Sequence, residues 1–370
     1  MSQEKQTINA ASNNTDLNDK LIEAINQNDF DSMKSLVEKG AEINPTNDRR
    51  APLMIAVNRG RLEMAEFLIK KGAEINNARD WLGRPMLMTA IDWRHFNIVK
   101  LLLERGADVY AKGVEGFSSL HFAAFLGIFN MVRLLINHGV DVDIQDDDGK
   151  TPLAWAAANG HLDIVEFLVE NGANIAAKDK EGLNVFGYAA GNGHLDIVEF
   201  LFDKGAKLDD RSTDGKTILS SAANIRGDLA VVKFLVEKGA DIHARENDGW
   251  TALITATVCG HLGIARFLVR QGIDINACDN AGRTALSYAA EYGRIRMVEF
   301  LIGQGAEINI PDSQGKTAVM WAAEIDRLGL WRNKEYEVVG DKYRTTERDH
   351  SDVVKLLVEN GAIPPVDDKQ

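Results

Sequence analysis

Short apolar runs and polar turns alternate along most of the chain, with the spacing of paired amphipathic helices. In residues 149–175, GKTPLAWAAANGHLDIVEFLVENGANI, a first helix would present Leu153, Ala156 and Ala157 on one face, and a second would carry larger apolar residues from Ile164 onward. Residues three and four apart share a helix face. Because one such pair cannot bury both faces alone, the pattern predicts helix pairs that pack on neighbouring pairs.

The ends of these helices carry capping residues. Thr151 can accept a backbone hydrogen bond as the N-cap, and Pro152 then occupies the first helical position, where its missing N–H is not needed. Gly160 separates the two helices, and Gly172 follows the last apolar residue, where a left-handed C-terminal residue favours glycine. Together these residues predict the boundaries of one helix–turn–helix unit.

The glycine that closes the second helix recurs with a nearly constant period. It stands at Gly40, Gly72, Gly106, Gly139, Gly172, Gly205, Gly239, Gly272, Gly305 and Gly361. Successive differences between these positions are 32, 34, 33, 33, 33, 34, 33, 33 and 56. Chance does not keep such a period over so long a stretch, so the chain is a repeat array.

A turn motif between the units completes the pattern. Asp-x-x-Gly occurs at residues 146–149, 179–182, 279–282 and 312–315, where Asp can bond its own downstream backbone and Gly supplies a positive φ. Residues 146–161 closely approach Asp-x-x-Gly-x-Thr-Pro-Leu-His-x-Ala-Ala-x-x-Gly-His, so the chain resembles ankyrin-repeat proteins. This resemblance implies an all-α repeat solenoid of about ten stacked units, each with a β-hairpin finger, an inner helix and an outer helix.

The repeat pattern sets the expected domain organisation. We expect a disordered polar tail over residues 1–15, a single repeat domain over residues 16–363 and a C-terminal tail over residues 364–370. The unit at residues 16–44 lacks the Thr-Pro-Leu opening and is polar on its outer side, as a terminal capping unit would be.

The last unit, about residues 312–363, contains the largest departure from the period. Its closing glycine comes 56 − 33 = 23 residues late, which predicts an insertion at about residues 326–348. Gly340-Asp341 lies between β-prone runs, a two-residue turn signal, so we expect a β-hairpin at roughly Glu335 to Thr346.

Composition narrows the classes of function. Lys and Arg number 42 against 55 Asp and Glu, a net charge of −13, which disfavours nonspecific binding to nucleic acid or to anionic membranes. Cys259 and Cys278 alone cannot form a disulfide framework, which favours a reducing compartment. No apolar run has the pattern of a signal peptide or the length of a membrane span. We therefore expect a cytoplasmic monomer, or one delivered into a host cytosol if the protein is an effector.

Candidate chemistry is sparse. His161, His194 and His261 follow the glycine between helices, where ankyrin repeats commonly place a structural His that bonds neighbouring backbone, and His121 matches the His of the Leu-His motif. The cysteines have no zinc-ligand spacing, and no phosphate-binding loop or nucleophile–base pair is recognisable. We expect no catalytic residue, no cofactor and no metal.

One inner-helix position is the main candidate for binding. The residue just before the Ala-Ala pair points away from the packed face. It is aromatic in five units, as Phe122, Trp155, Tyr188, Tyr288 and Trp321. In the ankyrin geometry this position lines the concave groove, and aromatic residues dominate interface energetics. Alternatively, these rings pack on the next unit and close the groove.

Further aromatic candidates lie at inner-helix ends and finger tips. They are Trp81, Trp93, Phe117, Phe125, Trp250 and Tyr292. The first four fall in adjacent units and could form an exposed apolar patch. In the insertion, Trp331, Tyr336 and Tyr343 are candidate anchors for a partner, although the insertion could equally cover the end of the array.

These features favour a protein–protein interaction module that binds a partner of unknown identity through the concave groove and finger tips. The alternatives are a regulatory or host-directed effector, or an inhibitor or scaffold associated with an enzyme, with residues 326–348 as a second contact. An enzyme is the third and weakest reading.

Overall fold

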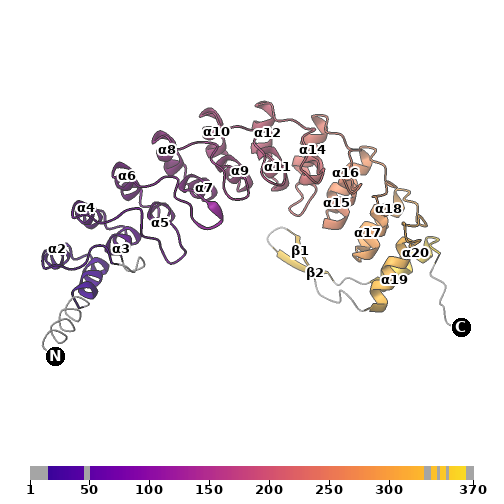
Figure 1. The fold of residues 1–370 in the computed structure, drawn as a ribbon. Coiled ribbons are helices and arrows are strands. Elements are labelled where there is room, and N and C mark those ends of the chain that lie inside the picture. Colours follow the sequence, from indigo (N-terminus) through magenta and orange to yellow (C-terminus); the bar gives the residue numbers. More distant parts are fainter. Residues whose placement is uncertain (1–15, 46–50, 329–334, 340–341, 347–349, 364–370) are drawn as a thin grey trace. The chain divides into compact units, whose positions relative to one another are not determined.

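The computed structural model describes residues 16–45, 51–328, 335–339, 342–346 and 350–363 (Figure 1). The chain divides into two compact units, Met1–Lys180 and Glu181–Gln370. Nearly all regular structure in the described residues is helical. The helices come in consecutive pairs, and in the pairs from α3–α4 to α17–α18 the first helix is shorter than the second.

In the first unit the helix pairs follow one another in sequence order. The helices are one over residues 16–27, α2 (Phe30–Glu38), α3 (Pro52–Asn58), α4 (Leu62–Lys70), α5 (Met86–Asp92), α6 (Phe96–Glu104), η2 (Val114–Gly116), α7 (Ser119–Phe125), α8 (Phe129–Asn137), α9 (Pro152–Ala158) and α10 (Leu162–Glu170). Inner helices α3, α5, α7 and α9 pack successively in one row, and outer helices α4, α6, α8 and α10 pack in a second row (Figure 1).

The second unit repeats this arrangement. Its helices are α11 (Val185–Gly191), α12 (Leu195–Asp203), α13 (Ile218–Ala222), α14 (Leu229–Glu237), α15 (Ala252–Cys259), α16 (Leu262–Arg270), α17 (Ala285–Glu291), α18 (Ile295–Gly303), α19 (Ala318–Leu328) and α20 (His350–Glu359). The odd-numbered helices form the inner row, and the even-numbered helices form the outer row.

Two strands lie between α19 and α20, within the expected insertion. Strand β1 (Glu335–Val339) pairs antiparallel with β2 (Lys342–Thr346), with Glu335 opposite Thr346 and Val339 opposite Lys342. The predicted turn residues, Gly340 and Asp341, lie outside the described residues, as does Trp331.

The core consists of the apolar faces that the pattern predicts. In the repeat that contains α9 and α10, five apolar side chains are completely buried: Leu153, Ala156, Ala157, Ile164 and Leu168. Each large aliphatic side chain contributes roughly 1.5–3 kcal/mol through burial. The alanines leave room for α7 on one side of α9, so most of this burial depends on neighbouring repeats.

The predicted structural role of the inter-helix histidines is confirmed at two positions. The Nε2 atom of His161 lies 3.1 Å from the carbonyl oxygen of Phe125, and that of His261 lies 2.8 Å from the carbonyl oxygen of Asn224. Each bond connects the start of an outer helix to the end of the preceding repeat's inner helix. The ring therefore sets the spacing between repeats.

Finger turns of successive repeats are also joined through their backbones. The backbone N–H and the hydroxyl of Thr213 both donate to the carbonyl oxygen of Glu181, each at 2.8 Å. Gly182 adopts a φ of +78°, and a Cβ atom there would lie 2.8 Å from the Thr213 nitrogen.

Replacing Gly182 by Ala should therefore destabilise the fold in two ways. A left-handed residue with a Cβ costs about 1–2 kcal/mol, and loss of the Thr213 hydrogen bonds adds about 1 kcal/mol or more. Gly205→Ala is the matched control because Gly205 has a φ of +93° and nothing within 4 Å of its Cβ position. Urea unfolding followed by circular dichroism should show the larger loss for Gly182→Ala. Equal losses would contradict the finger contact.

Candidate functional site

One carboxylate in the finger determines how an inner-helix ring is held. The Oδ1 atom of Asp146 accepts backbone hydrogen bonds from Asp148 at 2.9 Å and from Lys150 at 2.8 Å, which closes the turn. Its Oδ2 atom accepts a hydrogen bond of 2.8 Å from the Trp155 Nε1–H on α9. Asp146 itself is buried. The indole is therefore fixed in orientation by the same residue that shapes the finger.

The same device recurs with a spacing of nine residues. Asp279 accepts from the Tyr288 hydroxyl at 2.6 Å, and Asp312 accepts from the Trp321 Nε1–H at 2.9 Å. Both aspartates also accept two backbone N–H groups of their own turns. The constant nine-residue spacing from Asp to ring is visible in the sequence, but nothing in the sequence pattern alone indicates that the two side chains bond.

A cation from the finger lies against these rings. The guanidinium carbon of Arg283 lies 3.9 Å from the ring centroid of Tyr288 and 4.2 Å from that of Trp321. Lys316 Nζ lies 4.3 Å from the Trp321 centroid. Arg283 also forms an ion pair of 2.5 Å with Glu291. Because Arg283 contacts rings of two successive inner helices, it ties the α17 and α19 surfaces together.

In the first unit two phenylalanines form a cluster around Trp155. The centroid of Trp155 lies 4.9 Å from that of Phe117 and 5.6 Å from that of Phe125. Phe117 is only 9% exposed, whereas Phe125 is 38% exposed and Trp155 is half-buried. The cluster thus rests on Phe117 and presents parts of Phe125 and Trp155 to solvent.

A comparable cluster in the second unit contains Trp250 and Tyr288, whose ring centroids are 5.2 Å apart. Tyr288 is only 8% exposed. Burial, reinforced by the hydrogen bond to Asp279, raises the pKa of Tyr288 well above its ordinary value. Tyr288 therefore packs inside the surface, while the half-buried Trp250 covers it.

The structure places the other predicted rings at intermediate exposure. Phe122, Tyr188, Tyr292 and Trp321 are half-buried. The guanidinium carbon of Arg84 lies 5.5 Å from the Phe122 centroid. Inter-repeat packing, the alternative to an open groove, is thus part of this surface, but it leaves ring faces accessible. Tyr336 and Tyr343 lie on β1 and β2.

Two exposed indoles stand apart from these clusters. Trp81 and Trp93 line one pocket of about 370 Å³ together with Ile55, Arg59, Asn58 and Asn26. The predicted four-residue patch is therefore distributed over two sites. Trp81 and Trp93 line this pocket, whereas Phe117 and Phe125 belong to the Trp155 cluster.

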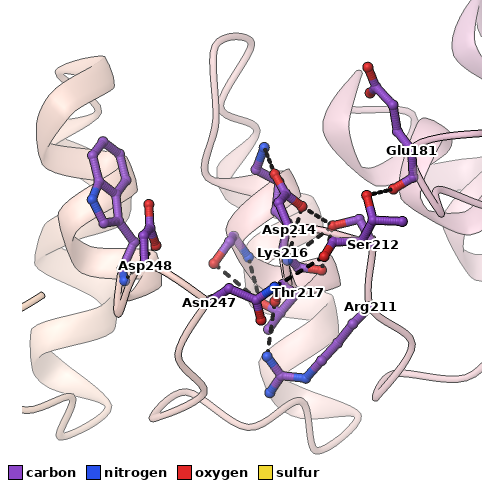
Figure 2. Close-up of polar contacts among 12 residues, drawn as sticks. Glu181, Arg211, Ser212, Asp214, Lys216, Thr217, Asn247 and Asp248 are labelled. Carbon is purple, nitrogen blue, oxygen red and sulfur yellow. Dashed lines mark hydrogen bonds and ion pairs between the residues drawn. The ribbon is translucent and has the colours of Figure 1, made fainter. Parts of the chain in front are cut away.

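In two repeats of the second unit, another residue stands at the position of the finger aspartate. Ser212 takes its place in the finger before α13, where it accepts from the Lys216 backbone at 3.0 Å and donates to Asp214 (Figure 2). Glu246 takes its place before α15, and there Asp248 closes the turn by accepting from the Trp250 backbone at 3.0 Å. Burial raises the pKa of Glu246, and its buried Oε1 atom has no hydrogen-bond partner among the described residues.

A Ser–His contact in the finger before α7 resembles a nucleophile and its base. Ser118 Oγ lies 2.9 Å from His121 Nδ1, and His121 Nε2 lies 3.0 Å from the Lys150 carbonyl oxygen. Both side chains have no solvent exposure, and burial lowers the pKa of His121. The pair forms a capping box at the start of α7, so it serves the fold.

The remaining reactive groups are isolated. Cys259 and Cys278 are free thiols, and burial raises the pKa of both. Within the described ranges, no three His, Cys, Asp or Glu side chains gather closely enough to hold a metal ion. The helices described in the structure do not include one with the length and apolar character needed to cross a bilayer.

Tyr288→Phe should lower the free energy of unfolding by about 1–3 kcal/mol, because it removes the only group that reaches the buried Oδ2 of Asp279 in the described contacts. Tyr110→Phe is the control, since Tyr110 is half exposed. Urea unfolding monitored by tryptophan fluorescence measures the difference. An unchanged midpoint for Tyr288→Phe would show that the carboxylate–phenol bond contributes nothing.

Glu246→Gln should stabilise the protein at neutral pH, by about 0.5–1 kcal/mol after allowance for its partial exposure. Because the folded-state pKa lies above the ordinary 4.5, the charged form opposes folding at pH values above that range. The gain should therefore be full at pH 7 and should disappear as the pH falls through the raised pKa toward 4.5. Thermal melts across this pH range measure it, with the exposed Glu237→Gln as control. A gain that does not depend on pH would contradict this explanation.

Comparison with known proteins agrees with the repeat geometry. Ankyrin repeats (3 copies) match residues 21–113, 111–179, 176–246, 220–312 and 275–330 in overlapping segments. A search of curated proteins finds no match. The matched segments cover most of the described helices, and the helix pairs, finger turns and inter-helix histidines fit this assignment, so the chain belongs to the ankyrin-repeat family.

Proposed function

We propose that this chain is a non-catalytic binding module that holds a partner protein through inner-helix rings and finger residues. The observation that carries the proposal is Trp155, a half-buried indole fixed by Asp146 and by two phenylalanines. A ring that is already immobile loses little entropy on binding, and it still offers a large apolar face. Ankyrin repeats are generally protein–protein interaction modules, which supports this proposal.

Each unit offers its own contact surface under this proposal. In the first unit the contacts are Phe122, Phe125 and Trp155, and in the second they are Tyr188, Trp250, Tyr292 and Trp321. Phe117 and Tyr288 support these rings from beneath because they are buried. Arg283 and Lys316 add polar contacts beside Trp321.

The proposal covers residues 16–363 as one binding domain of about ten repeats, acting as a cytoplasmic monomer. The insertion at residues 326–348 is proposed as a second contact for the partner. As a regulatory effector, or as an inhibitor or scaffold for an enzyme, the protein would use the same surfaces, so these roles differ only in the partner.

Capture from a cell lysate tests the proposal. Trp155→Ala and Trp321→Ala should each reduce recovery of the bound protein at least tenfold, because central aromatic anchors dominate binding energy. Phe167→Ala and Phe234→Ala are matched controls, since these rings pack in T-shaped pairs between outer helices. Recovery that falls equally in variants and controls, or in neither, would refute the proposal. Turnover of a substrate by the purified chain would refute its non-catalytic part.

A further inference from the structure

Two tryptophan side chains in the first compact unit are mostly exposed to solvent. Trp81 is 72% exposed and Trp93 is 58% exposed, and both line the pocket of about 370 Å³ with Ile55. A pocket of this size holds one large side chain and its neighbour. Exposed indoles in a shared pocket mark a surface that another molecule covers.

Hydrogen bonds hold the backbone around both indoles. Asp80 Oδ1 accepts backbone hydrogen bonds from Leu82 and Arg84, each at 2.9 Å, which holds the finger that carries Trp81. Trp93 is the C-cap of α5 and donates its backbone N–H to the carbonyl oxygen of Thr89 at 3.2 Å. The two rings therefore project from defined positions.

The charges beside the rings decide what the pocket can bind. Asp80 and Asp92 are the acidic neighbours of Trp81 and Trp93 in the chain, and Arg84 pairs with both, at 2.8 Å and 2.7 Å. Arg84, Asp80 and Asp92 together carry a net charge of 1 − 2 = −1, but both carboxylates are held by Arg84 and neither lines the pocket. A cation in the pocket would therefore meet aromatic faces and no carboxylate among the lining residues.

The charged side chain that does line the pocket is a cation. Arg59 is exposed at the end of α3, and its Nε donates to the Asn26 side-chain oxygen at 3.0 Å. This bond orients the guanidinium, and no other contact of its terminal nitrogens is found in the described part of the chain. Asn58 adds a further amide to the lining.

We propose that the Trp81–Trp93 pocket binds an extended segment of the partner protein in which an aromatic or large aliphatic side chain adjoins a carboxylate. The apolar side chain packs against the two indoles and Ile55, and the carboxylate pairs with the Arg59 guanidinium. Arg59 repels a cationic side chain, so methylated or free lysine is not the ligand. This inference rests on the proposed function and adds the chemistry of the partner.

A displayed library of random 12-residue peptides, selected on the immobilised full-length chain, tests the pocket directly. Enriched peptides should pair an aromatic or large aliphatic residue with an adjacent Asp or Glu. Trp81→Ala and Trp93→Ala should each weaken binding of a synthesised consensus peptide at least tenfold. Tyr110→Ala, which removes another exposed ring of the same unit, should leave binding unchanged. Thermal melts confirm that each variant is folded.

The charge contribution has its own readout. Arg59→Gln should weaken the consensus peptide severalfold and abolish the salt dependence of binding, whereas Arg59→Lys should retain that dependence. Replacing the peptide's acidic residue by its amide should have the same effect as Arg59→Gln, and the two changes together should not add.

Three outcomes would overturn the inference. The first is that the peptides bind both tryptophan variants as tightly as they bind the unaltered chain. The second is a consensus rich in Lys or Arg. The third is concentration-dependent self-association that is lost in Trp81→Ala, which would make a second copy of the chain the occupant. If peptide binding does not depend on Trp81 and Trp93 while lysate capture still depends on Trp155, this inference fails and the proposed function stands. If capture is also insensitive to Trp155, both fail.

Discussion

A single buried carboxylate at the start of a finger connects the turn to the inner helix behind it. In the fingers that begin at Asp146, Asp279 and Asp312, one oxygen closes the turn and the other accepts a hydrogen bond from a ring nine residues later. An unpaired buried carboxylate oxygen would cost about 1–3 kcal/mol. The fold therefore depends on having a donor at that helix position, which is the half-buried Trp155 or Trp321 in two repeats and the buried Tyr288 in the third.

Two repeats of the second unit lack the finger aspartate, and both also lack the ring nine residues later. Where Ser212 and Glu246 replace the aspartate, the helix position carries Ser221 and Thr255 in place of Trp or Tyr. Thr255 donates to its own helix at 3.2 Å, to the Thr251 carbonyl oxygen. Glu246 cannot serve the turn in the way Asp does, and its carboxylate is left partly unsatisfied. In these two repeats both the aspartate and the ring are absent. The Asp80 finger keeps the aspartate without a ring, and there the Thr89 hydroxyl donates to Asp80 Oδ2 at 3.2 Å.

The sequence predicts the repeated fold better than it predicts the surface. Glycine period, Thr caps and inter-helix histidines are local signals, and each has a counterpart such as the Thr151 cap at 3.2 Å. Exposure depends on side chains contributed by neighbouring repeats, before or after, which no local pattern encodes. Phe117 and Tyr288 are buried for this reason. The Trp81–Trp93 pocket likewise needs Arg59 and Asn26 from earlier repeats, so its chemistry emerges only when repeats are stacked.

An acidic partner segment is compatible with a chain of net charge −13 because charge acts over different distances. Beyond a Debye length of about 8 Å at physiological salt, the excess of carboxylates is largely screened. Asp80 and Asp92 pair with Arg84 outside the pocket lining, and Arg59 is the charged residue in the lining that a ligand meets. The overall charge therefore disfavours nonspecific binding of polyanions such as nucleic acids, which need broad basic surfaces, while one placed guanidinium can still select a single carboxylate.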